Sequence, residues 1–243
     1  GRQPADGYVS YLPSLFDFPL QEAVTVALLE KEDWGTGMRR IYRTLSYDGL
    51  YPDPDKLVVF PDNHDVSRIH TMLGQRAELT RMAVAFFLTT RGVPQIYYGT
   101  EILMHNPPGP KDDGLIRSDF PGGWPGDAKN AFTGEGLSAD ERAMQTYLRQ
   151  LLQWRRTAPA IRDGKLTQYV PMGGVYVYFR HDAAQKVMVI LNNNDAAQTV
   201  ETQRFQEVIG SATAGTDVIS GQPHVLASGI AVPAHSATIL ELH

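Results

Sequence analysis

The chain has 243 residues, of which 42% are hydrophobic and 20% charged, and its formal net charge is −5. This length and composition suit one or two folded cores and argue against disorder. The negative charge and the scattered Lys and Arg side chains disfavour nucleic acid as a partner. The longest apolar run, Met82–Leu88, is too short for a membrane-spanning helix of ~20 residues, and the lack of cysteine leaves cytoplasm and periplasm equally open.

The first hundred residues alternate between apolar strand-like runs and helix-like segments, which indicates a parallel sheet. Asp17 is expected to cap the first helix rather than to line a site. The predicted strands are Tyr8–Phe16, Leu57–Phe60 and Pro94–Tyr98. The predicted helices run from about Pro19 to Leu29, from about Thr36 to Leu45 and, as an amphipathic segment, from about Ala77 to Thr89.

Residues 103–137 have a different character, because they are rich in Pro and Gly and show little periodicity. We expect a long irregular loop there, and such loops are usually functional or disordered. Ser138 and Glu141 then form a capping box, which starts a helix that ends near Pro159.

Short alternating segments with polar turns follow this helix. Examples are Val175–Phe179, Lys186–Leu191 and Ala237–Leu242. This pattern predicts an antiparallel β-sandwich. We therefore divide the chain into an α/β part, residues 1–158, and an all-β part, residues 159–243.

Four adjacent polar residues, Asp62-Asn63-His64-Asp65, directly follow the predicted strand Leu57–Phe60. In parallel (β/α)-barrels the reacting groups lie at the carboxyl ends of strands. A carboxylate beside an imidazole and an amide can hold sugar hydroxyls, and the same set can ligate a metal ion. A simple turn, in which Asp and Asn cap the next segment, is the third interpretation.

Three segments resemble known sequences. Val59–Arg68, VFPDNHDVSR, resembles the motif after the seventh barrel strand in the α-amylase superfamily, glycoside hydrolase family 13. Val93–Ile102, VPQIYYGTEI, is similar to the eighth-strand motif of that family, with matching order and spacing. Ile116–Trp124, IRSDFPGGW, is similar to a loop of cyclomaltodextrinase- and neopullulanase-like members. The resemblance implies the C-terminal part of the protein: about strands six to eight of a (β/α)8 TIM barrel, followed by an antiparallel β-sandwich.

The resemblance also implies roles for individual residues. Asp65 would be the catalytic carboxylate that holds sugar hydroxyls and supports the oxocarbenium-like transition state, without acting as the nucleophile. His64 would bind the same glucose, Asn63 would shape the turn that presents both, and Arg68 would bind at a neighbouring subsite. Retaining hydrolysis also needs a nucleophile and a general acid about 5 Å apart. In this family both belong to earlier barrel strands, which this sequence does not contain.

Trp124 lies in the Pro/Gly-rich loop, where its ring would either stack on a sugar or anchor the loop by packing. The loop leaves the strand end that also carries Asp65, so we predict that it borders the substrate groove. Arg117-Ser118-Asp119 and Gly134-Glu135 are similar to the nucleophile and acid motifs of the family. Neither follows a buried strand, and we interpret both as loop residues.

We therefore predict a glycoside hydrolase that cleaves α-glucosidic bonds in maltooligosaccharides, cyclodextrins or related α-glucans with retention, and we expect this segment alone to be inactive. A non-catalytic carbohydrate-binding or assembly subunit is the alternative, and metal-dependent hydrolysis at Asp62, His64 and Asp65 is a third possibility. The expected partners are the α-glucan substrate and the upstream part of the same barrel. No cofactor is evident from the residues, and the resemblance allows Ca²⁺ in the complete protein.

Overall fold

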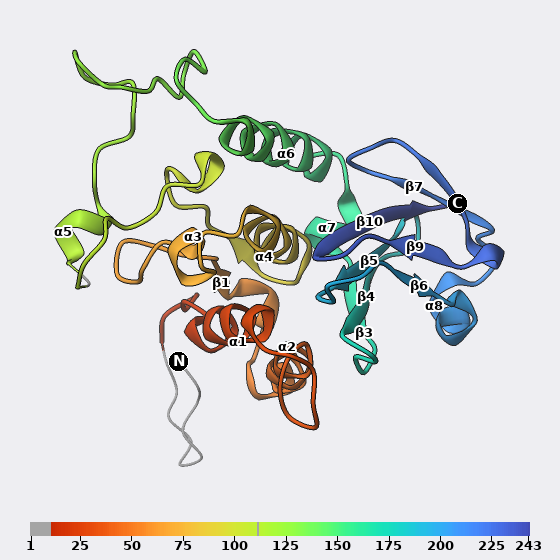
Figure 1. Ribbon diagram of the computed structural model, residues 1–243. Helices are drawn as coiled ribbons and strands as arrows, with labels where there is room; N and C mark the ends of the chain where they lie inside the picture. Colours follow the sequence, from red (N-terminus) through yellow and green to blue (C-terminus); the bar gives the residue numbers. More distant parts are fainter. Residues whose placement is uncertain (1–10, 111) are drawn as a thin grey trace.

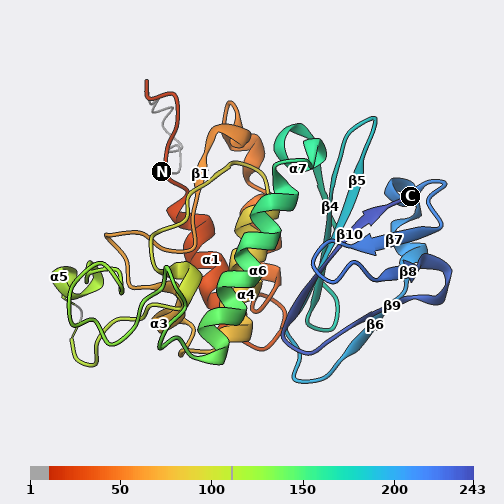
Figure 2. The ribbon, with the colours of Figure 1, turned by 90° about the horizontal axis from the view of Figure 1, so that it is seen from above.

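The computed structural model describes residues 11–110 and 112–243. A helical part, in which β1 and β2 pair in parallel, packs against an antiparallel β-sheet, and Figures 1 and 2 show the two as adjacent layers. The elements of the helical part are α1 (Phe18–Leu29), α2 (Arg39–Leu45), β1 (Val58–Val59), α3 (Ile69–Met72), α4 (Ala77–Thr89), β2 (Val93–Pro94), α5 (Asp113–Ile116), α6 (Ala139–Arg155) and α7 (Pro159–Asp163). Short 3-10 helices cover Asp48–Leu50, Pro54–Lys56 and Thr100–Ile102.

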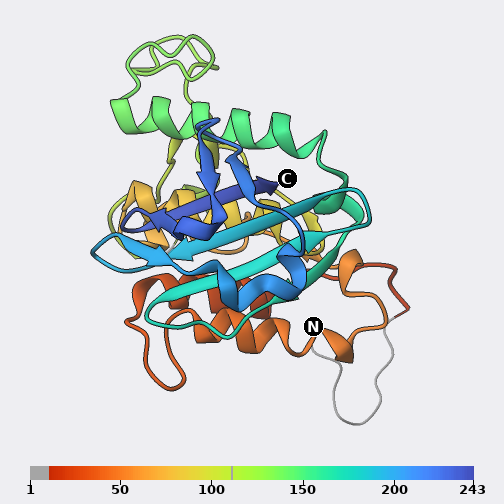
Figure 3. The ribbon, with the colours of Figure 1, turned by 90° about the vertical axis from the view of Figure 1, so that its right-hand side faces the viewer.

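The C-terminal part forms a six-stranded antiparallel sheet in the order β3-β4-β5-β10-β7-β8, with a separate β6–β9 pair on its outer face. Figure 3 looks onto this outer face, with the helical part behind the sheet. The predicted antiparallel sandwich is thereby confirmed. Its elements are β3 (Lys165–Gln168), β4 (Val175–His181), β5 (Lys186–Asn192), β6 (Gln198–Val200), α8 (Gln206–Ile209), β7 (Ala214–Asp217), β8 (Pro223–Val225), β9 (Ile230–Val232) and β10 (Ser236–Leu242), together with 3-10 turns at Thr202–Phe205 and Leu226–Ser228.

The parallel strands are much shorter than the sequence predicts. Only Val58–Val59 of the second predicted strand pairs, with Val93–Pro94, and Phe16 adds a single parallel bridge to Val58. Residues 8–10 of the first predicted strand lie outside the described residues. A β-strand is defined by hydrogen bonds to a neighbouring strand. An apolar run therefore forms a strand only over the residues that pair with such a neighbour. The order of the three segments and their parallel direction agree with a barrel fragment.

The helix starts follow the sequence closely. Asp17 caps α1, because its Oδ1 accepts a hydrogen bond from the backbone N of Leu20 at 3.1 Å, and Pro19 lies in the first turn. Ser138 and Glu141 form the predicted capping box at the start of α6. Helix α7 then leads into the sheet, so the predicted boundary near residue 158 falls between two helices and stays a prediction.

Helix α4 is buried almost all round, whereas the sequence predicts an amphipathic helix. Ten of its thirteen residues are buried, among them Phe86 and Phe87. The helix contacts α1, α6 and the sheet strand β10, and a single apolar core runs from α1 through α4 to the inner face of the sheet. The hydroxyls of Thr89 and Tyr178 are 2.5 Å apart across this junction. None of the described helices is long and apolar enough to cross a membrane.

An ion-pair network closes the core at the end of α4. Arg91 has a side chain only 3% exposed, and its Nη2 lies 2.8 Å from Asp17 Oδ2. It also donates two hydrogen bonds to Asp48, at 2.9 and 2.6 Å. The network joins the start of α1, the turn after α2 and the segment that leads into β2. Pairing of this kind offsets the cost of burying these charges.

We expect Arg91→Met to lower the free energy of unfolding by about 3–5 kcal/mol, because it leaves the Asp17 and Asp48 carboxylates without their counter-charge. Urea unfolding at neutral pH measures the change. The exposed Arg149→Met in α6 is the control and should cost little. An equal, small loss in both variants would contradict a structural role for the network.

Candidate functional site

The loop after β1 is built by two buried side chains. Asp62 is fully buried, and its Oδ2 accepts a hydrogen bond from the backbone N of Ile69 at 2.8 Å, at the start of α3. Its Oδ1 accepts one from the Thr100 hydroxyl at 3.0 Å, just after β2. Asn63 Oδ1 accepts from the backbone N atoms of Asp65 and Val66, at 2.8 and 3.2 Å. These contacts fold the loop into a tight turn and tie it to the neighbouring strand end.

The turn exposes His64 and Asp65 to solvent. Their side chains are 60% and 56% exposed, and His64 Nε2 lies 3.2 Å from Asp65 Oδ1. Arg117, from the loop after α5, reaches the same place and donates two hydrogen bonds to the His64 carbonyl, at 3.0 and 2.9 Å. Its Nη2 is 3.5 Å from Asp65 Oδ1. The structure thus brings an imidazole, a carboxylate and a guanidinium together on an open surface.

Arg68 lies beneath this surface rather than on it. The residue is 1% exposed, and its guanidinium carbon lies 4.3 Å above the ring of Tyr97 and 4.7 Å above that of Tyr98. It donates hydrogen bonds to the carbonyls of Tyr98 and Ile116. A side chain held in this way supports three loops from inside, and in this conformation it presents no surface to a sugar. Asn63 is likewise buried, within the turn that it shapes.

Trp124 stands in the irregular segment between α5 and α6 and is 64% exposed. The Asp127 carboxylate shapes its turn by accepting hydrogen bonds from the backbone N atoms of Gly122 and Trp124, at 2.7 and 3.1 Å. Gly122 has φ +102°, and an added Cβ would lie 2.6 Å from Asn130 Oδ1, so the turn needs glycine there. The Trp124 residue is therefore mostly exposed on a defined turn.

Three further acidic residues, Glu101, Glu135 and Asp119, lie in turns and loops near the strand ends or before α6. Glu101 Oε2 accepts a hydrogen bond from the backbone N of Gly99 at 2.7 Å. Glu135 is exposed in the turn that faces Asn130, and Asp119 is an exposed loop residue next to Ser118. Among the described residues no group of three or more His, Asp or Glu side chains gathers as a metal ion requires.

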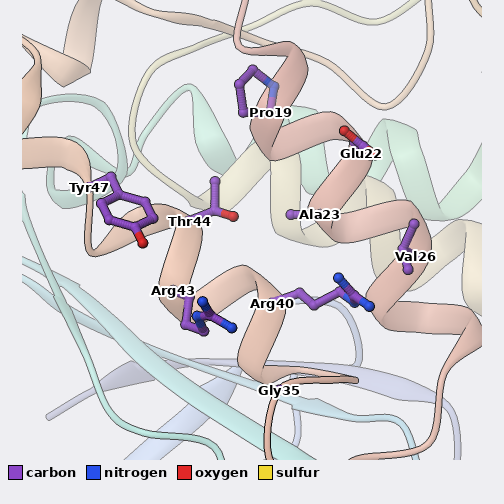
Figure 4. A pocket seen from close by; sticks show the side chains of 9 residues that line it. All are labelled: Pro19, Glu22, Ala23, Val26, Gly35, Arg40, Arg43, Thr44 and Tyr47. Atoms are coloured by element: carbon purple, nitrogen blue, oxygen red, sulfur yellow. The ribbon is translucent and has the colours of Figure 1, made fainter. Parts of the chain in front are cut away.

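Two pockets help to delimit the site. One of about 370 Å³ opens between α1 and α2, where Arg40 is already paired with Glu30, and none of its lining residues follows β1 or β2 (Figure 4). Another of about 470 Å³ lies between α3 and the segment 105–115, and Ser67 and Asn106 line it. Only the second of these adjoins the loop that carries His64 and Asp65. Figures 1 and 2 place α3 on the side of α4 away from the sheet and α5 at the far end of the molecule.

Sequence reasoning missed two of these links. Thr100 is 38 residues from Asp62, and Arg117 is 53 residues from His64. Neither contact has a local pattern, because both arise where separate loops meet at the strand ends. The similarity of the Ile116–Trp124 loop to a subgroup of the α-amylase superfamily was the one available signal for Arg117.

Family models match nearly the whole chain: "Alpha amylase, catalytic domain" covers residues 27–164, and "Cyclo-malto-dextrinase C-terminal domain" covers residues 166–241. A cyclomaltodextrin glucanotransferase of Bacillus sp. (strain 38-2) is 30% identical over 74% of this chain, which spans 22% of that protein. Alpha-amylase 3 of Dictyoglomus thermophilum is 27% identical over 79% of the chain and 41% of its own length.

Solved structures share the fold at low identity. The α-amylase of Geobacillus thermoleovorans, complexed with acarbose, superposes with a TM-score of 0.76 at 20% identity, covering 96% of this chain and 48% of that one. AmyP in complex with maltose gives a TM-score of 0.78 at 21% identity, covering 97% and 52%. The chain thus spans about a fifth to a half of the length of these relatives.

Burial raises the pKa of Asp62 to about 6, although its two hydrogen bonds and nearby Arg68 favour the ionised form. The native state then holds this proton more tightly than the unfolded chain does. The contribution of Asp62 to stability is therefore largest below the unfolded pKa of about 4 and is lost as the pH rises through about 6.

We expect Asp62→Asn to remove the contribution of Asp62 to the pH dependence of the free energy of unfolding. This contribution amounts to at most about 3 kcal/mol between pH ~4 and ~7. Urea unfolding across that range measures it, with the exposed Asp140→Asn as control. Curves for Asp62→Asn and wild type that stay parallel throughout the range would show that the Asp62 carboxyl does not titrate in this way.

Proposed function

This chain belongs to the α-amylase catalytic-domain family, and from that premise we propose that it forms part of a glycoside hydrolase that cleaves α-glucosidic bonds with retention. The proposed substrates are maltooligosaccharides, cyclodextrins or related α-glucans. The relatives favour this class, since they include cyclomaltodextrin glucanotransferases and an α-amylase. Two solved neighbours carry maltose and maltotriose in their structures.

The exposed His64–Asp65 pair is the observation that carries the proposal. It lies on a turn fixed from inside by Asp62 and Asn63, at the carboxyl end of β1. That edge is where (β/α)-barrels carry their reacting groups. In the proposed mechanism Asp65 accepts hydrogen bonds from hydroxyls of the bound glucose, and His64 donates one to the same sugar. These bonds strengthen as the ring distorts toward the oxocarbenium-like transition state, which lowers the barrier rather than only the substrate Kd.

The nucleophile and the general acid are assigned to barrel strands outside this sequence. A retaining site needs two carboxyl groups about 5 Å apart on opposite sides of the scissile bond. Asp119 and Glu135 are poor candidates, because both lie exposed in loops and neither ends a strand. We therefore propose that the chain alone binds glucan without cleaving it.

Asp65, His64 and Trp124 are the proposed sugar contacts. The proposal gives Asn63 and Arg68 an indirect part, since both are buried and hold the loops that carry the exposed groups. The Trp124 indole offers a flat apolar face of the kind that stacks on a sugar ring. The proposal gives none of the described residues a role in binding a metal ion or an organic cofactor.

We expect the purified chain to leave a chromogenic maltoside uncleaved. In a protein that completes the barrel, Asp65→Asn should lower kcat by orders of magnitude with a smaller change in KM, because the lost contacts strengthen in the transition state. Asp119→Asn, in the neighbouring loop, is the matched control and should keep its kcat.

Three results would contradict this assignment. Cleavage by the purified chain, lost on Asp65→Asn, would place the missing carboxylates within this sequence. Full kcat in Asp65→Asn of the completed barrel would reduce Asp65 to a loop residue. A completed barrel that binds glucan but never cleaves it would favour the alternative, a non-catalytic carbohydrate-binding subunit.

We expect Trp124→Ala to weaken maltooligosaccharide binding by about 1–3 kcal/mol, on the scale of an aromatic ring that stacks on a planar ligand. Thermal stability should change little, because the side chain is mostly exposed. Trp34→Ala, an even more exposed tryptophan in the α1–α2 loop, is the control. Calorimetric titration and thermal unfolding of both variants decide the matter: full affinity with a lower Tm would make Trp124 a packing residue.

A further inference from the structure

Arg117, which lies outside the β1 loop, contacts both halves of the His64–Asp65 pair. Its Nε and Nη2 both donate to the His64 carbonyl, at 3.0 and 2.9 Å, and Nη2 lies 3.5 Å from Asp65 Oδ1. His64 Nε2 approaches the same Oδ1 at 3.2 Å. One guanidinium thus fixes the backbone of the turn and faces the carboxylate that the turn presents.

The position of Arg117 is itself fixed on both sides. The Ile116 carbonyl accepts a hydrogen bond from Arg68 Nε at 3.1 Å, and the Ser118 carbonyl accepts one from the Tyr98 hydroxyl at 2.8 Å. Ile116 is also fully buried. Arg68 in turn lies against the Tyr97 and Tyr98 rings after β2. The loops after β1, β2 and α5 are therefore joined into one unit, and Arg117 is the exposed end of that unit.

From this geometry we propose that Arg117 is a positioning residue: it orients His64 and Asp65 for the sugar by clamping the His64 carbonyl and attracting the Asp65 carboxylate. The role assigned to Asp65 rests on the proposed function; the clamp itself does not. Arginine suits this task because its planar fork can give two hydrogen bonds to one acceptor and keep a further N–H for the carboxylate. A lysine keeps the charge and loses the fork.

A purely structural role for Arg117 predicts a different result. If Arg117 only held the α5 loop in place, its loss would lower stability and would leave the order of the β1 loop and the Asp65 carboxylate unchanged. The two roles are therefore separable by measurements on His64–Val66, whose turn also has hydrogen bonds from inside to Asp62 and Asn63 and can form in the absence of the Arg117 side chain.

The test compares Arg117→Met and Arg117→Lys with a matched control, Arg142→Met. Arg142 is also exposed and also donates to a loop carbonyl, that of Gly134 at 3.2 Å, in the segment next to α6. On the full chain, NMR records the amide order parameters of residues 64–66 and the Asp65 carboxylate carbon signal. Thermal unfolding checks the fold, and NMR titration with maltotriose gives the Kd.

We expect Arg117→Met to lower the order of residues 64–66, to shift the Asp65 carboxylate signal and to raise the maltotriose Kd about 3- to 10-fold, the value of one to two hydrogen bonds. Arg117→Lys should restore the carboxylate signal but not the full backbone order, and Arg142→Met should change none of the three. If Arg117→Met does not fold, comparing Arg117→Lys with the wild-type chain still tests the proposal, since its carboxylate signal should match the wild type and its backbone order should be lower.

Loop order and carboxylate signal in Arg117→Met that match those of Arg142→Met would overturn the proposal. So would an Arg117→Lys variant whose carboxylate signal equals that of Arg117→Met, because the charge would then be irrelevant. If wild-type chain fails to bind maltotriose, the proposed function fails at this step, while the two NMR signals still test the clamp.

Discussion

The nearly complete burial of α4 is the constraint on which the rest of the structure depends. The helix lies in contact with α1, α6 and β10, so the barrel segment and the C-terminal sheet share one apolar core. Because α4 belongs to the connection between the parallel strands β1 and β2, its packing also fixes how the two strand ends meet. The Thr100–Asp62 hydrogen bond and the Arg91–Asp17 ion pair each join residues that lie before and after this helix in the sequence.

Two buried ionisable groups show how the helical part balances stability against precise placement. Arg91 has two carboxylate partners, Asp17 and Asp48, whereas the hydrogen-bond donors to Asp62 are neutral and the pKa of Asp62 is raised. A neutral side chain would cost less to bury than the Asp62 carboxylate. The carboxylate can accept from both the α3 start and Thr100, and this double contact joins the loops that carry the site.

The candidate site separates buried supports from exposed contacts. Asp62, Asn63 and Arg68 hold the loops from inside, while His64, Asp65 and Arg117 present their polar groups to solvent. Such an arrangement suits a ligand that is rich in hydroxyl groups, since preorganised donors and acceptors bind at a lower entropic cost than mobile ones do. It also leaves the reacting edge incomplete, because three parallel segments provide only part of the eight strands that close a barrel.

The sequence by itself determined the order and type of the elements and the family resemblance. The helix starts at Asp17 and Pro19 and at Ser138 and Glu141 are set within one helical turn, and the short apolar runs of β4, β5 and β10 are also local in the sequence. Both features could be recognised without coordinates. The tertiary structure alone decided the all-round burial of α4, the short lengths of β1 and β2, and the inward direction of Arg68. It also decided the contact of Arg117 with a turn 53 residues away. These features depend on contacts between segments that are far apart in the sequence, and the local periodicity of the sequence does not predict such contacts.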